Sequence, residues 1–226
     1  MDGQVLDGRN IMPLLEGKSM DEHPLFIDFQ FHMGVLCAPS STVRLGDYKL
    51  LRFYWAGENA ESHYYELFDL KRDPAEAINL ASYMPEKVKE LDALITQHLE
   101  ETEAIIPIRN TNFEGNPRQQ RSDPEKSLIR PKSYHLAKSD MAFEMEKGSR
   151  TLQLLNQDST ACKTAAVLLQ GSDWVSIRNM DNGQVELTWD RSMKKENAKI
   201  LFGWSGGTTA QEMNDWTLDP FELIIK

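Results

Sequence analysis

Alternating hydrophobic and polar residues predict several short strands in the first half of the chain. The run from Pro24 to Phe31 alternates phenylalanine and isoleucine with polar residues, the period-two pattern of a strand with one buried face. Two more runs, 43–44 and 48–55, flank a Gly-Asp pair that is typical of a tight turn. A fourth run covers His63 to Leu70. The pattern therefore predicts a meander of about four strands.

A helical period replaces this alternation after residue 84. From Pro85 to about Glu103, one stripe of residues recurs at three- and four-residue spacing, with charged residues opposite. The stripe consists of Val88, Leu91, Leu94, Ile95, His98 and Leu99. Upstream, Asp73-Pro74-Ala75-Glu76 offers a capping aspartate, a proline at the first helical position and a glutamate that can reach back, so it predicts another helix start. Strands covered by one amphipathic helix make an α+β unit.

The second half has a different pattern, with short strand candidates and no long helical period. Seven candidates occur, at residues 141–146, 151–157, 165–170, 174–178, 184–189, 199–204 and 221–225. Turn-like pieces separate them, namely Lys147-Gly148-Ser149, Asp181-Asn182-Gly183 and Ser205-Gly206-Gly207. This spacing predicts an all-β, sandwich-like domain.

A polar stretch separates the two patterns. Residues 114–133 contain three prolines and no aromatic residue, a composition that buries too little apolar surface to order itself. We interpret it as a linker, with an ordered loop that crosses a neighbouring domain as the alternative. The predicted organisation is an α+β unit at 1–113, a linker at 114–133 and an accessory β-sandwich at 134–226.

Composition excludes several classes of function. The 226 residues include 35 acidic and 25 basic ones, which gives a net charge of −10 and argues against binding to nucleic acid or an anionic membrane. No apolar stretch approaches the roughly 18 residues of a membrane helix. The two cysteines, Cys37 and Cys162, are too few for a disulfide framework or a zinc site.

Four motifs follow one another through the first half. They are residues 7–17 (DGRNIMPLLEG), residues 44–50 (RLGDYKL), residues 66–80 (ELFDLKRDPAEAINL) and the helix from Met84-Pro85 with the tail to Asn112-Phe113. The first three resemble DG-x-S-L-x-P-L-L-x-G, R-x-G-D-Y/W-K-L and E-L-Y-D-L-x-x-D-P-x-E-x-x-N-L of sulfatases, the formylglycine-dependent sulfuric ester hydrolases of the alkaline-phosphatase-like superfamily. The resemblance covers residues 1–113 and leaves residues 114–226 unrecognised.

The resemblance implies that this half is a sulfatase C-terminal subdomain, a small antiparallel sheet with a terminal helix packed on the catalytic core. In that family the formylglycine, its arginine and the carboxylates that hold a divalent metal, usually calcium, lie upstream of these motifs. We therefore expect no catalytic residue and no metal ligand in this chain. Calcium and a missing sulfatase catalytic domain are implied for the parent enzyme, which would be periplasmic or secreted.

Cys37-Ala38-Pro39-Ser40-Ser41 resembles the formylglycine motif C-x-P-S-R but has serine in place of arginine. It also runs directly into the strand turn at 43–50, far from the family's catalytic motifs. We interpret Cys37 as structural or incidental.

Two sets of residues are candidates for substrate binding. Alternation places Asp28, Gln30 and His32 on one face of the first strand, where they could hydrogen-bond a sugar or form a solvated face. Of four tryptophans in the second half, strand parity predicts Trp189 and Trp204 buried. Trp174 and Trp216 remain as a sugar-stacking platform, with core packing as the alternative.

These observations predict the C-terminal part of a sulfatase that acts on sulfated carbohydrate and is inactive by itself. The alternative is a non-enzymatic carbohydrate-binding or interaction protein. We also expect the 1–113 unit to carry an apolar face without a partner, since the catalytic core that normally covers it is missing.

Overall fold

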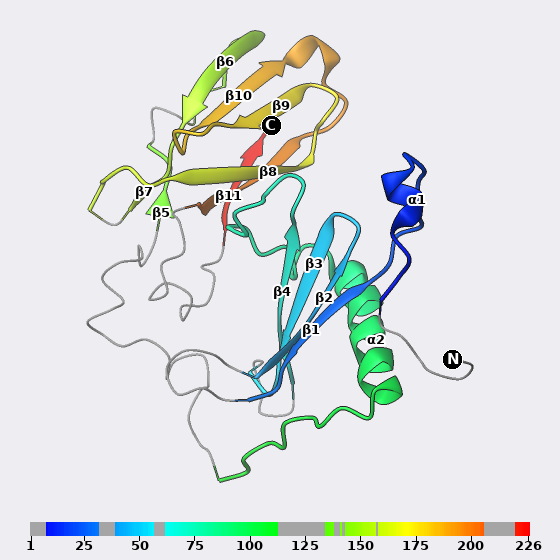
Figure 1. The fold of residues 1–226 in the computed structure, drawn as a ribbon. Helices are drawn as coiled ribbons and strands as arrows, with labels where there is room; N and C mark the ends of the chain where they lie inside the picture. The colour runs from blue at the N-terminus through cyan, green and yellow to red at the C-terminus, as the bar shows by residue number, and fades with distance from the viewer. Residues whose placement is uncertain are drawn as a thin grey trace.

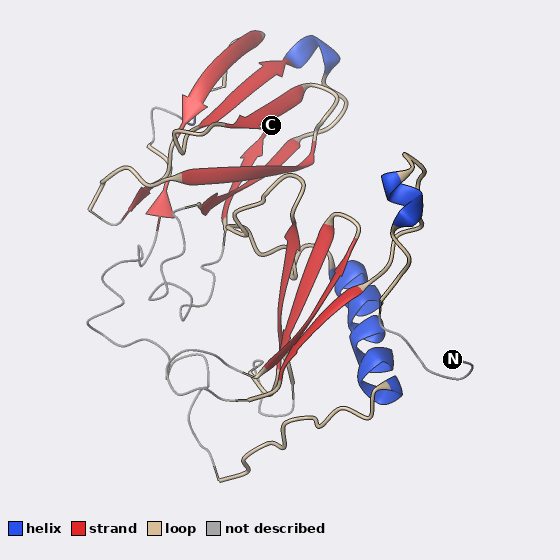
Figure 2. Ribbon diagram, in the orientation of Figure 1, coloured by secondary structure: helices blue, strands red, loops and turns tan. Residues whose placement is uncertain are grey.

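The computed structural model describes residues 8–31, 39–56, 62–112, 134–137, 141, 143–156, 158–205 and 220–226. The molecule is mostly sheet with few helices (Figure 2). The predicted linker at 114–133 lies outside the described residues. No helix in the described ranges is both long and apolar enough to span a membrane.

The first half forms a four-stranded antiparallel sheet in the order β1-β2-β3-β4 (Figure 1). Its strands are β1 (Leu25–Phe29), β2 (Ser40–Leu45), β3 (Tyr48–Phe53) and β4 (Tyr64–Asp69). The predicted tight turn joins β2 to β3, and Gly46 has a φ of 58°, which favours glycine. A short helix, α1 (Met12–Leu15), precedes the sheet and buries none of its residues.

Helix α2 (Pro85–Glu101) packs against one face of this sheet. It starts at the predicted proline, and its buried residues, Leu91, Ile95 and Leu99, come from the predicted stripe. They share a hydrophobic core with Val43, Leu50 and Leu67 of the sheet.

The helix predicted to start at Asp73 is wrong. Residues 73–76 form a turn, and Glu76 has a φ of 53°, a left-handed conformation that cannot continue a helix. The Asp73 carboxylate still accepts a backbone hydrogen bond, from the Ile78 amide at 2.8 Å, but it closes a loop. Glu76 extends away and pairs with Lys49 at 2.8 Å.

The second half contains two three-stranded antiparallel sheets. One has the order β6-β10-β9, from β6 (Lys147–Leu152), β10 (Val185–Asp190) and β9 (Val175–Asn179). The other has the order β12-β11-β8, from β12 (Phe221–Ile225), β11 (Ala198–Trp204) and β8 (Thr164–Gln170). A small pair joins β5 (Tyr134–His135) to β7 (Leu155–Asn156), and a 3-10 turn, η3 (Arg191–Met193), follows β10.

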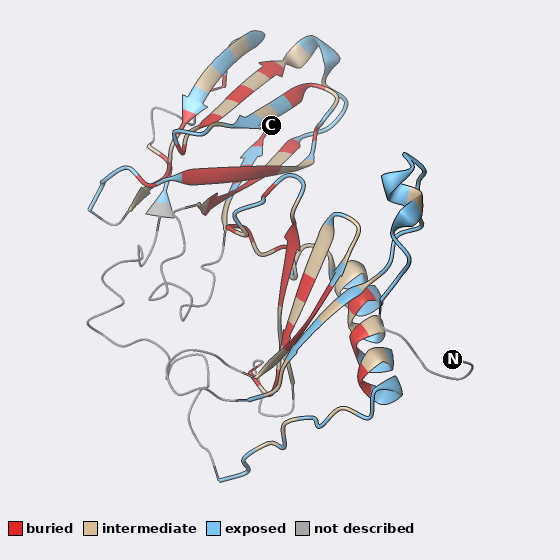
Figure 3. Cartoon of the chain, viewed as in Figure 1, coloured by how far each residue is buried: buried red, intermediate tan, exposed pale blue. Residues whose placement is uncertain are grey.

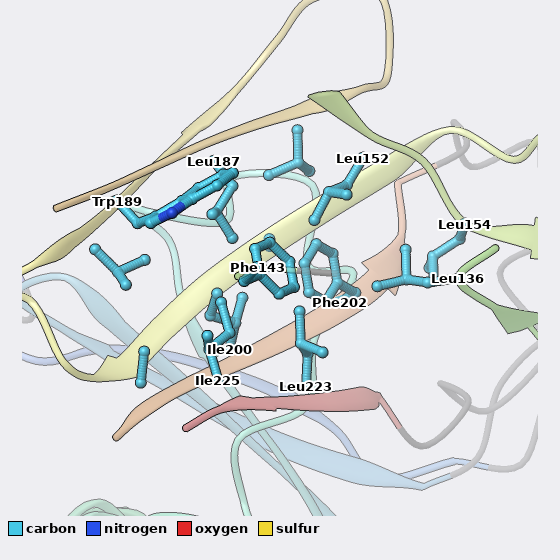
Figure 4. Close-up of a cluster of buried hydrophobic side chains, with 14 of the residues drawn as sticks. Leu136, Phe143, Leu152, Leu154, Leu187, Trp189, Ile200, Phe202, Leu223 and Ile225 are labelled. Carbon is cyan, nitrogen blue, oxygen red and sulfur yellow. The ribbon is translucent and has the colours of Figure 1, made fainter. Parts of the chain in front are cut away.

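Side chains from both three-stranded sheets converge on one core (Figure 4). Leu152, Leu187 and Trp189 come from the first sheet. Ile200, Phe202, Leu223 and Ile225 come from the second. Five of the seven predicted strands overlap a full strand of these sheets, and the turn at Asp181-Asn182-Gly183 joins β9 to β10.

The strand predicted at Met141–Glu146 and the turn predicted at 147–149 are both wrong. Strand β6 begins at Lys147, so Gly148 lies inside a strand, opposite Trp189 of β10. A Cβ atom on Gly148 would lie 2.3 Å from Cζ2 of that indole. The glycine therefore makes room for a tryptophan on the neighbouring strand, a use that strand glycines have when another group approaches closely. The candidate at 151–157 divides between the end of β6 and β7.

Candidate functional site

A polar cluster connects β1, β2 and α2 around Asp28, one of the predicted site residues. Ser41 Oγ donates to Asp28 Oδ1 at 2.6 Å, and His98 Nε2 lies 3.0 Å from Asp28 Oδ2. Because the Ser41 hydroxyl has one proton and gives it to the carboxylate, Tyr54 donates to Ser41 Oγ at 2.8 Å. His98 also stacks on Phe26, with ring centroids 4.0 Å apart. The carboxylate of Asp28 thus ties the edge strand to the helix.

This cluster contains serine, histidine and aspartate but not the geometry of a nucleophilic triad. In a triad, histidine takes the serine proton and the acid orients the histidine. Here the acid lies between the other two residues, so among the described residues the base in contact with Ser41 is a carboxylate. Ser41 is also fully buried, out of reach of any substrate. The arrangement can fix structure but cannot perform acyl or sulfuryl transfer.

A second polar group lies further along the same face of the sheet. Arg52 is 5% exposed and donates from Nε to Asp92 Oδ1 at 2.6 Å and from Nη2 to Thr96 Oγ1 at 2.6 Å. Burial, aided by Asp92, raises the pKa of Tyr65 to about 12. Burial and the neighbouring Arg52 lower the pKa of His63. The guanidinium is held by α2 from several sides, which makes this group a second connection between sheet and helix.

The other predicted residues of the β1 face are less well placed. The Nε2 atom of Gln30 is buried and has no hydrogen-bond partner within the part of the chain that the structure describes, so it points into the protein and not toward solvent. His32 and Cys37 lie outside the described residues. A substrate-binding role for Asp28, Gln30 and His32 stays a prediction. Sequence reasoning missed Ser41 and Tyr54, because the contacts of Ser41 with Asp28 and Tyr54 depend on strand register.

The predicted tryptophan platform fails at Trp174, which is 4% exposed. Its indole Nε1 donates to the Glu196 carbonyl at 2.8 Å, and Arg191 lies over its ring. The parity argument was wrong because Trp174 sits in the turn before β9, where strand alternation does not apply. Trp189 is buried as predicted, and Trp204 is half-buried against the same core. Trp216 lies outside the described residues.

The outward face of the β6-β10-β9 sheet is polar. Its register places Ser149 beside Thr188 and Ser176 beside Thr188, and the last two hydroxyl groups are 2.6 Å apart. An ion pair between Arg178 and Glu186 continues this face. Since no aromatic residue lies on it in these three strands, it offers no stacking surface for a sugar ring.

The four-stranded sheet exposes apolar side chains of its edge strand β1 on the side away from α2. Phe26 and Asp28 contact His98 of the helix, so the alternate residues Leu25 and Ile27 face the opposite way. Their exposed fractions are 59% and 68%. Phe31, just beyond the strand, is 73% exposed.

Within the described part of the chain, no group of three or more His, Cys, Asp or Glu side chains could hold a metal ion.

Comparisons with known proteins concern the first half. The family described as N-sulphoglucosamine sulphohydrolase, C-terminal, matches residues 2–104, from before α1 to just beyond α2. Arylsulfatase K from Xenopus laevis is 33% identical over 99 residues, an alignment that covers 39% of this chain. The same alignment covers 17% of the relative, so the chain matches less than a fifth of that protein's length.

Proposed function

We propose, from the finding that residues 2–104 are a sulfatase C-terminal segment, that this chain is the C-terminal part of a sulfatase acting on sulfated carbohydrate. In this proposal the segment completes the fold of the enzyme, and the chemistry belongs to a catalytic region outside these 226 residues. Residues 134–226 are an accessory β-sandwich of the same enzyme.

The observation that carries the proposal is the apolar outer face of the four-stranded sheet. Leu25 and Ile27 of edge strand β1 stand on it exposed to solvent. Half-buried Leu51 and Phe53 of β3 face the same way, on the far side of β2. Exposed apolar patches of this kind usually mark an interface. In the proposal, the partner is the catalytic region of a sulfatase, and the family match of residues 2–104 supports this choice.

The polar groups of the first half support a structural role. Asp28 and Arg52 bond residues of α2, and Ser41 bonds Asp28, so these groups fix the helix to the sheet. Formylglycine chemistry with calcium therefore falls to the catalytic region, whose carboxylates would supply the hard oxygen ligands that this cation prefers. The same family resemblance supports a parent enzyme that is exported, either to the periplasm or out of the cell.

The alternative, a non-enzymatic carbohydrate-binding or interaction protein, has lost one of the two tryptophans that supported it. It required Trp174 and Trp216 on one exposed face, and Trp174 is buried. The outward face of the β6-β10-β9 sheet carries hydroxyl groups and an ion pair.

Two assays test the proposal. The pure chain should hydrolyse neither an aryl sulfate nor a sulfated oligosaccharide, with Cys37→Ala as the matched variant. Turnover that Cys37→Ala abolishes would overturn the proposal. Residues 2–104 should also replace the matching segment of Arylsulfatase K with its aryl sulfatase activity retained. The same exchange carrying Leu25→Lys and Ile27→Lys should lose activity, because the charges disrupt the apolar contact.

A further inference from the structure

We propose that residues 134–226, to which the family match does not extend, act as a clamp on the sulfatase segment. The clamped element is the connection between β4 and α2, residues 70–84, called here the β4–α2 segment. The surface that holds it is the outer face of β8 and β11. This role does not depend on the proposed sulfatase activity, because it concerns contacts within this chain.

Apolar side chains from both halves form a single core at this contact. Ala165 and Val167 of β8 and Leu201 of β11 belong to the same hydrophobic cluster as Ile78 and Leu80 of the β4–α2 segment. The alternate residues of the same strands belong to the other core, inside the second half. Strand β8 is thus buried on both faces from Thr164 to Val167, and β11 from Ile200 to Gly203; Figure 3 shows the buried part of β8 in red.

Gly203 of β11 shows how closely the two halves approach. A Cβ atom on it would lie 2.4 Å from the Ala77 carbonyl oxygen and 2.8 Å from Cγ1 of Ile78. Its φ lies outside the left-handed region, so the backbone conformation does not require glycine. The contact with the β4–α2 segment requires it.

Polar contacts fix the orientation of the same surfaces. The Asn179 side-chain amide donates to the Arg72 carbonyl at 3.1 Å and also bonds both backbone groups of Ala166 in β8. Arg72 in turn donates from Nη1 to the Leu168 carbonyl at 3.3 Å. Lys199 of β11 lies over the ring of Tyr83, 5.0 Å from its centroid.

The β4–α2 segment passes this contact on to the sheet of the sulfatase segment. The Leu80 amide donates to the Leu67 carbonyl at 2.7 Å, and the Asn79 side chain accepts from the amides of Leu67 and Ala81. A substitution in β11 therefore affects strand β4 through the β4–α2 segment, which contacts both. As a clamp, the second half stabilises the first, and a substitution at this contact lowers the stability of both halves.

A double-mutant cycle tests this coupling in the full chain. Ile78→Ala and Leu201→Ala remove side chains that share the contact. The equilibrium constant of unfolding of the double variant should therefore differ by about fivefold from the value that the two single variants predict if their effects are independent. Ile78→Ala with Leu187→Ala is the control, because Leu187 belongs to the other core, and these effects should add. Additive effects for both pairs would overturn the proposal.

Hydrogen exchange locates the coupling. In Gly203→Ala, the amides of Ile78 and Leu80 should exchange at least about tenfold faster than in the native chain, while the Leu187 amide in β10 keeps its rate. Gly203→Val should extend the loss to β4. The proposal is wrong if Gly203→Ala leaves the β4–α2 segment protected, or if only residues of the second half lose protection.

Discussion

The two halves of the molecule differ in the sheet face that each leaves uncovered. The four-stranded sheet exposes Leu25 and Ile27 on the side away from α2. The β6-β10-β9 sheet exposes hydroxyl groups and the Arg178–Glu186 pair on the side away from its core. A polar face needs no partner, whereas an apolar one of this kind usually has one.

The second half therefore leaves a polar sheet face exposed to solvent, whereas the first half leaves apolar side chains exposed. The second half buries apolar residues in two places, inside its own core and on the face that meets the β4–α2 segment, while Met145, Met193 and Ile224 are exposed. The first half buries apolar residues against α2 and against the second half, and has a third set left over. That third set is where we expect the catalytic region of the sulfatase.

The largest predicted effect concerns a buried charge in the first half. Arg52→Met leaves Asp92 without its buried partner and should lower the free energy of unfolding by about 3 kcal/mol. The matched variant is Arg178→Met, which breaks the exposed pair on the second half and should cost about 0.5 kcal/mol or less. Urea unfolding of both variants measures the difference. Equal losses would contradict the distinction between the two regions.

A smaller effect is expected where Gly148 faces Trp189. Gly148→Val places side-chain atoms in the space of the indole and should cost about 2 kcal/mol through overpacking. Ser149→Val, the next residue of β6 on the polar face, should change stability by less than about 0.5 kcal/mol. Thermal unfolding of the two variants, side by side, checks the prediction, which fails if the glycine variant is as stable as the serine variant.

The pH dependence of stability should report on Asp73 at the contact between the halves. Burial raises the pKa of Asp73 to about 6, with Glu76 and Asp69 as the nearby carboxylates. A raised pKa in the folded state contributes stability below the unfolded value, and that stability is lost as the pH rises through 6. Between pH 7 and pH 5 this group should stabilise the protein by about 1 kcal/mol.

Asp73→Asn isolates this contribution from His63, whose lowered pKa acts in the opposite direction over the same range. The difference between native chain and variant in the free energy of unfolding should change by about 1 kcal/mol from pH 7 to pH 5. A difference that stays constant across this range would show that Asp73 does not titrate there.

Local patterns predicted much of the fold because apolar residues recur with the period of a strand or a helix, or gather in short runs bounded by turns. The alternation around Ile27 located β1, and the stripe that includes Leu91 located α2. Strand β12 was predicted from end to end, at 221–225. These elements show their periodicity within a few residues, without help from distant parts of the chain.

Features that depend on distant contacts could not be predicted. Gly148 and Gly203 are glycines because other parts of the chain approach them, and neither neighbour is visible in the local sequence. Asp73 has the sequence of a helix cap, yet residues 73–76 form a turn in which Glu76 is left-handed, so no helix starts there. In the candidate site, Asp28 was found by alternation, but its partner Ser41 follows from the register of β1 against β2.

The central claim is that the apolar surface around Leu25 and Ile27 is exposed and lacks its partner. The most direct test is the binding of a fluorescent dye for apolar surface to the native chain. The account predicts that the chain binds the dye and that Leu25→Lys with Ile27→Lys reduces this binding severalfold at unchanged stability. Ser149→Lys with Thr188→Lys, on the polar face, should leave dye binding as it is. Equal dye binding by the native chain and the Leu25→Lys, Ile27→Lys variant would contradict the account.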